Sequence, residues 1–151
     1  MTLWKVLHVV SMFSAVTLLV GGSVYFDLIV RKRDARLLAR FGSLAMGPLA
    51  NVGVALIVAG IVFGIVTAIV GDFDLTETWL VIAYVIAVLL FILGPIEGRL
   101  AARAIEAAEA AGDGWPEELA KVAEDPRRTA LSWASTLLYI AIIVDMVAKP
   151  F

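Results

Sequence analysis

The sequence predicts an all-α fold, a four-helix transmembrane bundle, from its composition, its apolar blocks and the placement of its charges. Of its 151 residues, 62% are hydrophobic and 17% are charged, whereas soluble domains average about half apolar and a quarter charged. The mean hydropathy is +0.96. Helices are expected at about 3–30, 41–70, 78–111 and 126–148. The apolar part of each reaches the roughly 20 residues needed to cross a bilayer.

The first apolar block is expected to stay in the membrane as a helix. It lacks the basic segment that precedes the apolar core of a secretory signal, and it is about twice as long as such a core. The other blocks are equally unbroken, which excludes the alternating pattern of a membrane barrel. We therefore expect a single integral membrane domain, residues 1–151, surrounded by the lipid bilayer.

The positive charges predict the orientation of the bundle. Cations cluster in the first and third connections, and the second connection has none. The first carries Arg31, Lys32, Arg33, Arg36 and Arg40, and the third carries Arg99, Arg103, Lys121, Arg127 and Arg128. Loops rich in Lys and Arg stay in the cytoplasm. Both termini are therefore expected on the outer side of the cell (inner) membrane, in a multi-pass protein.

The third connection is expected to be a helical cytoplasmic connector. Helix three should run on through 101–111, which is rich in Ala and Glu, and stop at the glycines of 112–114. A short surface helix should follow Pro116. Asp125 before Pro126 predicts the start of helix four, because aspartate is a preferred N-cap and proline a preferred first helical residue.

Small residues on helices two and three predict close helix packing. Glycines at helical spacing let two backbones approach each other in lipid, and these lie at Gly53, Gly60, Gly64, Gly94 and Gly98. We expect them to pack helix two against helix three. The alternative is a homo-oligomer, or a subunit of a larger membrane complex, formed through an outward-facing stripe.

Composition excludes several classes of function. Cysteine is absent, so the chain has no disulfide and no thiolate metal site. It has no basic stretch with interleaved aromatic residues, and no nucleic acid is expected as a partner. It also lacks a phosphate-binding glycine loop and the serine elbow of hydrolases. No catalytic residue can be named.

His8, the only histidine, is the first candidate site residue. Histidines in membrane helices usually face the bundle, and we expect a hydrogen bond to Asp145 at a similar depth on helix four. A haem ligand, a metal ligand or a proton carrier is the functional alternative. Met12 and Met146 lie at similar depth, so the three side chains could bind Cu(I), although methionine more often fills gaps in packing.

Acidic and basic residues near the cytoplasmic boundary form a second candidate site. Asp27 on helix one and Glu97 on helix three lie there, with Arg31, Arg99 and Arg103 within reach. Ion pairs that fix the helix ends are expected. The alternative is the mouth of a polar cavity.

Both ends of the chain resemble one group of small membrane proteins. The opening residues 3–9 (LWKVLHV), the closing residues 145–151 (DMVAKPF) and the segment 36–48 are similar to HemJ-type protoporphyrinogen oxidases and to copper-resistance protein D. The closest likeness is to an uncharacterised integral membrane family near this group. The resemblance implies haem b association, with His8 as the axial ligand.

The chain departs from the HemJ-type pattern in its second half. The third helix has no lysine between Trp79 and Arg99, and the Arg-Arg before helix four is not followed by Asn-Glu. Whether the protein is an enzyme, such as a haem-linked membrane oxidoreductase, therefore stays open. Copper or small-solute transport and a non-enzymatic membrane subunit are the other hypotheses. No cofactor other than haem b is expected.

Overall fold

The computed structural model describes residues 2–148, all of whose regular elements are helices. They are α1 (Thr2–Lys32), α2 (Ala35–Leu44), the π-helical turn η1 (Ala45–Leu49), α3 (Ala50–Val70), α4 (Thr78–Ala111), α5 (Glu117–Ala123) and α6 (Pro126–Ala148). Four segments are long and apolar enough to cross a membrane: Leu3–Lys32, Ala35–Val70, Thr78–Ala111 and Glu117–Ala148. The expected all-helical fold with four membrane-length helices is confirmed.

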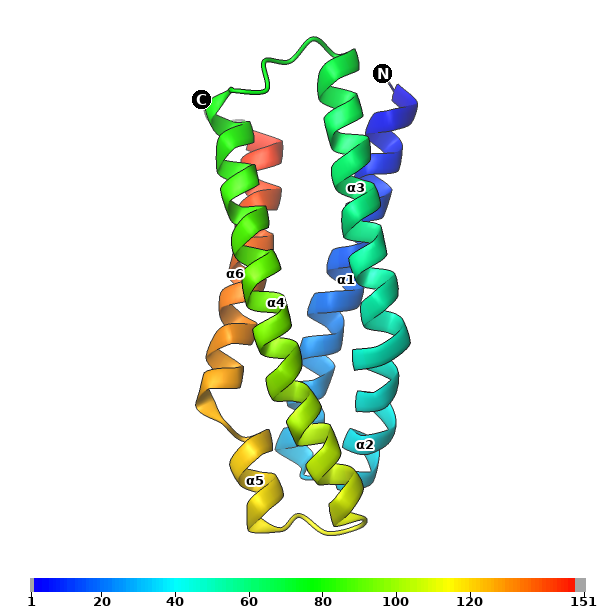
Figure 1. The fold of residues 1–151 in the computed structure, drawn as a ribbon, viewed down its shortest axis with the longest axis vertical. Coiled ribbons are helices and arrows are strands. Elements are labelled where there is room, and N and C mark those ends of the chain that lie inside the picture. Colours follow the sequence, from blue (N-terminus) through cyan, green and yellow to red (C-terminus); the bar gives the residue numbers. More distant parts are fainter. Residues whose placement is uncertain (1, 149–151) are drawn as a thin grey trace.

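The long helices form two antiparallel pairs, as Figure 1 shows. α3 packs along α1, and α4 packs along α6. The turn of residues 71–77 joins the pairs at one end of the molecule, where α1 begins and α6 ends. α2 and α5 lie at the opposite end. These ends are called the 71–77 end and the α2/α5 end below.

The glycines of α3 pack against α1, so the expected packing of helix two against helix three is wrong. A Cβ at Gly60 would lie 2.5 Å from the sulfur of Met12, and one at Gly64 would lie 2.8 Å from Nδ1 of His8. Gly53 faces Leu19 in the same way. The short 71–77 connection would have allowed α3 to pack on α4 as well, so the observed pairing depends on the close fit of the α3 glycines against α1. The Gly-x-x-x-Gly stripe is thus used inside the chain.

The second membrane-length segment begins earlier than expected, at Ala35, and contains one π-helical turn. Asp34 caps α2, since its side chain accepts a hydrogen bond from the backbone N–H of Leu37 at 2.9 Å. Pro48 then lies in η1. Proline has no N–H to complete an α-helical turn, and a single π-helical turn accommodates it.

The connection between α4 and α6 follows the sequence signals. α4 passes through Pro95 and ends at Ala111, and Gly112 adopts a positive φ of 63°. α6 starts at Pro126, and the Asp125 carboxylate accepts a hydrogen bond from the N–H of Arg127 at 2.8 Å. The short helix α5 lies between them as expected.

The turn at the 71–77 end is held by Asp74. Its carboxylate accepts hydrogen bonds from the backbone N–H of Thr76 at 2.9 Å and from the Thr76 hydroxyl at 2.7 Å. These bonds favour the ionised carboxylate and lower the pKa of Asp74 below its usual value. Phe73 and Trp79 stack edge to face beside it.

An apolar cluster closes the α2/α5 end. It joins α1, α2, α4 and α5 through buried residues: Phe26, Ile29, Val30, Ala35, Leu38, Ala101, Ala104, Ile105, Ala108, Leu119 and Ala123. Alanines on α4 allow α2 to approach closely. The two helix pairs are therefore joined at this end by a conventional hydrophobic core.

A buried ion pair supports the same end. Arg128 on α6 donates a hydrogen bond from Nη2 to Asp27 on α1 at 2.6 Å, and its guanidinium lies 4.5 Å from the centre of the Phe26 ring. The side chains of Arg128 and Asp27 are only 4% and 20% exposed. Asp27 was expected to pair with a neighbouring arginine such as Arg31. It pairs instead with a residue about a hundred positions away.

Replacing Gly60 by leucine should disrupt the α1–α3 contact. The added side chain meets Met12 at once, and overpacking of this kind costs about 1–3 kcal/mol of unfolding free energy. Gly94→Leu is the control, because a Cβ there meets nothing within 4 Å. Chemical denaturation in detergent micelles measures both. Equal losses for the two variants would contradict this packing.

Removing one partner of the buried ion pair should destabilise the protein far more than removing one partner of an exposed pair. Asp27→Ala leaves Arg128 buried without a counter-ion, which costs about 3–5 kcal/mol. Asp113→Ala breaks the exposed Arg36–Asp113 pair and should cost less than about 1 kcal/mol. The same denaturation measurement compares them. A loss for Asp27→Ala no larger than that for Asp113→Ala would refute the structural role of the pair.

Candidate functional site

A cavity of about 1000 Å³ lies between the two helix pairs. Its lining extends from Phe73 and Trp79, at the 71–77 end, to Ala45 and Met46 of η1, next to α2. Its volume is at the upper limit of typical cofactor and ligand sites, about 300–1000 Å³. It is the candidate site of the protein.

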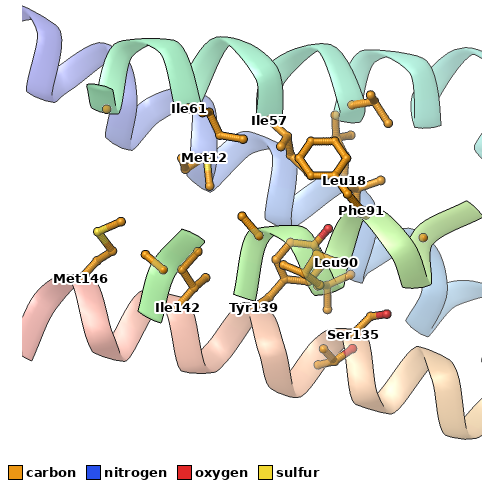
Figure 2. Close-up of a pocket in the computed structure, with 18 of the residues that line it drawn as sticks. Met12, Leu18, Ile57, Ile61, Leu90, Phe91, Ser135, Tyr139, Ile142 and Met146 are labelled. Atoms are coloured by element: carbon orange, nitrogen blue, oxygen red, sulfur yellow. The ribbon is translucent and has the colours of Figure 1, made fainter. Parts of the chain in front are cut away.

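The walls of the cavity are mostly apolar, and its two sides come from different helix pairs. Figure 2 shows Met12, Leu18, Ile57 and Ile61 on the α1–α3 side, and it shows Tyr139, Ile142 and Met146 on α6 opposite them. Ser135 of α6 and Leu90 and Phe91 of α4 are the other lining residues labelled there. Such walls suit a ligand with a large apolar surface.

Gly94 and Gly98 of α4, which were expected to pack against helix two, line this cavity instead. A Cβ at either position would meet nothing within 4 Å. Glycine therefore has opposite effects on two helices of the bundle. On α3 it allows close helix contact, and on α4 it leaves room for a ligand.

His8 lines the cavity and donates a hydrogen bond across the α1–α3 interface. Its Nδ1 lies 2.7 Å from the carbonyl oxygen of Gly60. A carbonyl can only accept, so Nδ1 carries the hydrogen. The neutral ring then keeps its lone pair on Nε2, which is the atom available to a ligand. The expected bond from His8 to Asp145 is not formed, because α3 rather than α6 is the neighbour of α1 at this depth.

Asp145 lies on the buried face of α6, which packs against α4. The residue is 7% exposed, and its Oδ2 atom has no hydrogen-bond partner within residues 2–148. It does not line the cavity. Asp145 is therefore a buried polar residue outside the candidate site.

The two methionines of the possible copper site line the cavity from opposite walls. Met12 rests on Gly60, and Met146 projects from α6 on the far side (Figure 2). In the part of the chain that the structure describes, His, Cys, Asp and Glu side chains form no cluster of three or more that could hold a metal. His8 and Met12 belong to the α1–α3 pair, and Met146 belongs to the α4–α6 pair.

Glu97 is a polar member of the cavity wall near α2. Its Oε1 accepts a hydrogen bond from the Ser23 hydroxyl at 3.0 Å, which links α4 to α1. Both residues line the cavity, as does the exposed Arg99. The expected ion pair of Glu97 with Arg99 or Arg103 is not formed among residues 2–148, and Glu97 bonds to Ser23 in the cavity wall instead. A lone serine in an apolar helix gave no signal of that contact.

Four polar residues of α6 also line the cavity: Ser132, Ser135, Thr136 and Tyr139. They were not singled out from the sequence. Ser135 is 8% exposed, and its hydroxyl oxygen has no hydrogen-bond partner within residues 2–148.

Comparison of the chain with protein-family models, with curated proteins and with solved structures found no match. The class of the protein therefore rests on its own structure. It is an all-helical protein with four membrane-length segments and an apolar cavity between two helix pairs.

Proposed function

We propose that this protein binds haem b in the cavity between its helix pairs, with Nε2 of His8 as the axial ligand, and that it serves a redox-linked role in the cell membrane. The observation that carries the proposal is the hydrogen bond from Nδ1 of His8 to the Gly60 carbonyl. Ligating histidines almost always donate their other ring N–H to a carbonyl or carboxylate, which fixes the tautomer and the ring plane.

The lining of the cavity fits such a group in size and polarity. The cavity of about 1000 Å³ has apolar walls next to His8, supplied by residues such as Met12 and Ile61. Lys5 lines the same end, and its ammonium group can pair with a propionate carboxylate. A bound haem supplies one-electron transfer, and the protein tunes it through the ligand and its surroundings.

The chain's own residues hold and shield the group in this proposal. Gly60 orients the imidazole through its carbonyl, and Gly64 leaves space for the ring because any side chain there would meet it. The apolar walls exclude water and lower the local dielectric constant, which favours a defined redox potential. Orientation with the 71–77 end on the outer side follows from the positive charges of the first and third connections.

Absorption spectroscopy of the purified protein tests the ligand. Protein produced with haem supplied should show a Soret band, and His8→Ala should lose most of it because no other histidine exists. Imidazole added to His8→Ala should restore the band, since a free ring can occupy the space left by the side chain. Wild-type protein without a Soret band, or an unchanged band in His8→Ala, would refute haem ligation by His8.

A pair of neighbouring tryptophan substitutions tests the cavity. Ala87 lines it, whereas Val88 is 58% exposed on the outer surface of α4. Ala87→Trp should fill the space beside His8 and lower haem content at least severalfold, and Val88→Trp should leave it unchanged. Haem content per protein is measured by the pyridine haemochrome assay. Equal haem content in both variants would place the haem outside this cavity.

A further inference from the structure

The cavity also contains polar groups on the α2 side of His8 that haem ligation by His8 does not use. Ser23, Glu97, Ser135 and Tyr139 come from three helices and all line it. The Ser135 hydroxyl is the informative one, because it is more than nine-tenths buried and has no partner within residues 2–148. Burying an unpaired hydroxyl costs free energy. A bound molecule that accepts its hydrogen bond would explain it.

These groups lie inside the apolar span. Ser135 is nine residues after the start of α6, a rise of about 14 Å, and 13 residues before its end, a rise of about 20 Å. A charged lipid head group would need to leave water and lie beside the Glu97 carboxylate. Phosphate and carboxylate heads are therefore disfavoured at this depth. The site requires a neutral head group that can enter the hydrocarbon region.

We infer that the part of the cavity beside Glu97, Ser135 and Tyr139 binds the head group of an isoprenoid quinone. A quinone ring presents two carbonyl oxygens, which can accept hydrogen bonds from the hydroxyls of Ser135 and Tyr139. The reduced form presents hydroxyls instead, and Glu97 is an acceptor for one of them. Phe91 and Pro95 line the same region and offer flat apolar surfaces to the ring, and the apolar walls accommodate the tail.

The combination of groups distinguishes a quinone from other neutral lipids. A sterol or polyprenol has one hydroxyl, which could pair with Ser135 or with Tyr139 but could not also reach Glu97 on α4. A quinone and its reduced form use both the donors on α6 and the acceptor on α4. Figure 2 shows the Tyr139 ring extending from α6 into the space between the helix pairs, toward the α1–α3 side.

Quinone binding is separable from haem binding. His8 and Ser23 are 15 positions apart on α1, a distance of about 22 Å along the axis. The Ser23–Glu97 end of the proposed quinone site would therefore lie about that far from the haem ligand along the cavity. The quinone site depends on Glu97 of α4 and on Ser135 and Tyr139 of α6. The inference of quinone binding therefore holds even if the purified protein shows no Soret band.

Photolabelling with an azido-quinone tests the inference on the full chain in phosphatidylcholine nanodiscs. Labelling should saturate, should be displaced by decylubiquinone, and should map to peptides of α4 and α6 around Glu97 and Ser135. Tyr139→Phe and Ser135→Ala should each raise the half-saturating concentration roughly five- to tenfold, the effect of one lost hydrogen bond. Gly98→Leu, which fills the cavity there, should abolish saturable labelling.

Two matched variants serve as controls. Tyr25→Phe and Ser43→Ala remove the same atoms outside the cavity and should label like the wild type. In quinone-free detergent, Ser135→Ala should melt at the same temperature as the wild type or higher, because it removes an unpaired buried hydroxyl. Labelling that does not saturate, labelling equal in all variants, or a lower melting temperature for Ser135→Ala would each overturn the assignment.

Discussion

The ion pair between Arg128 and Asp27 joins the two helix pairs at the α2/α5 end, and the arrangement of the rest of the bundle depends on this connection. Both charges are largely removed from water, so each depends on the other and on the Phe26 ring beside the guanidinium. The apolar cluster of α1, α2, α4 and α5 surrounds the same end. With the pairs fixed there, their membrane portions can stay apart along the cavity.

Packing inside each pair explains why a cavity can exist between them. In lipid, helices associate through close van der Waals contact rather than through exclusion of water. Gly60 and Gly64 allow α3 to make this contact with α1. Ala83, Ile86 and Ile142 make the corresponding contact between α4 and α6. Each pair therefore satisfies its own packing. The helix faces that line the space between the pairs therefore do not have to pack against another helix.

The polar residues of the cavity divide by position into two groups with different chemistry. His8 is oriented by a backbone carbonyl and offers one nitrogen lone pair. Glu97, Ser135 and Tyr139 offer donors and an acceptor without a ring nitrogen. The haem proposed at His8 and the quinone proposed beside Glu97 would each use one of these groups.

Local sequence signals determined the helices and their ends. Hydropathy blocks fixed four membrane-length segments, the glycine at 112 ended α4, and Asp125 with Pro126 began α6. These features depend on neighbouring residues alone, as helix capping and apolar length do. The η1 turn around Pro48 is a partial exception, because proline predicts an irregularity without specifying a π-helical turn.

Partners across the bundle were decided by the tertiary structure. The sequence showed a glycine stripe, a histidine and two acidic residues in the membrane, but it did not show that Gly60 faces Met12, that His8 bonds to α3, or that Asp27 meets Arg128. In lipid every helix face can be apolar, so hydropathy carries no information about which face meets which helix. The choice of neighbours, and with it the cavity, depends on how the four segments pack together.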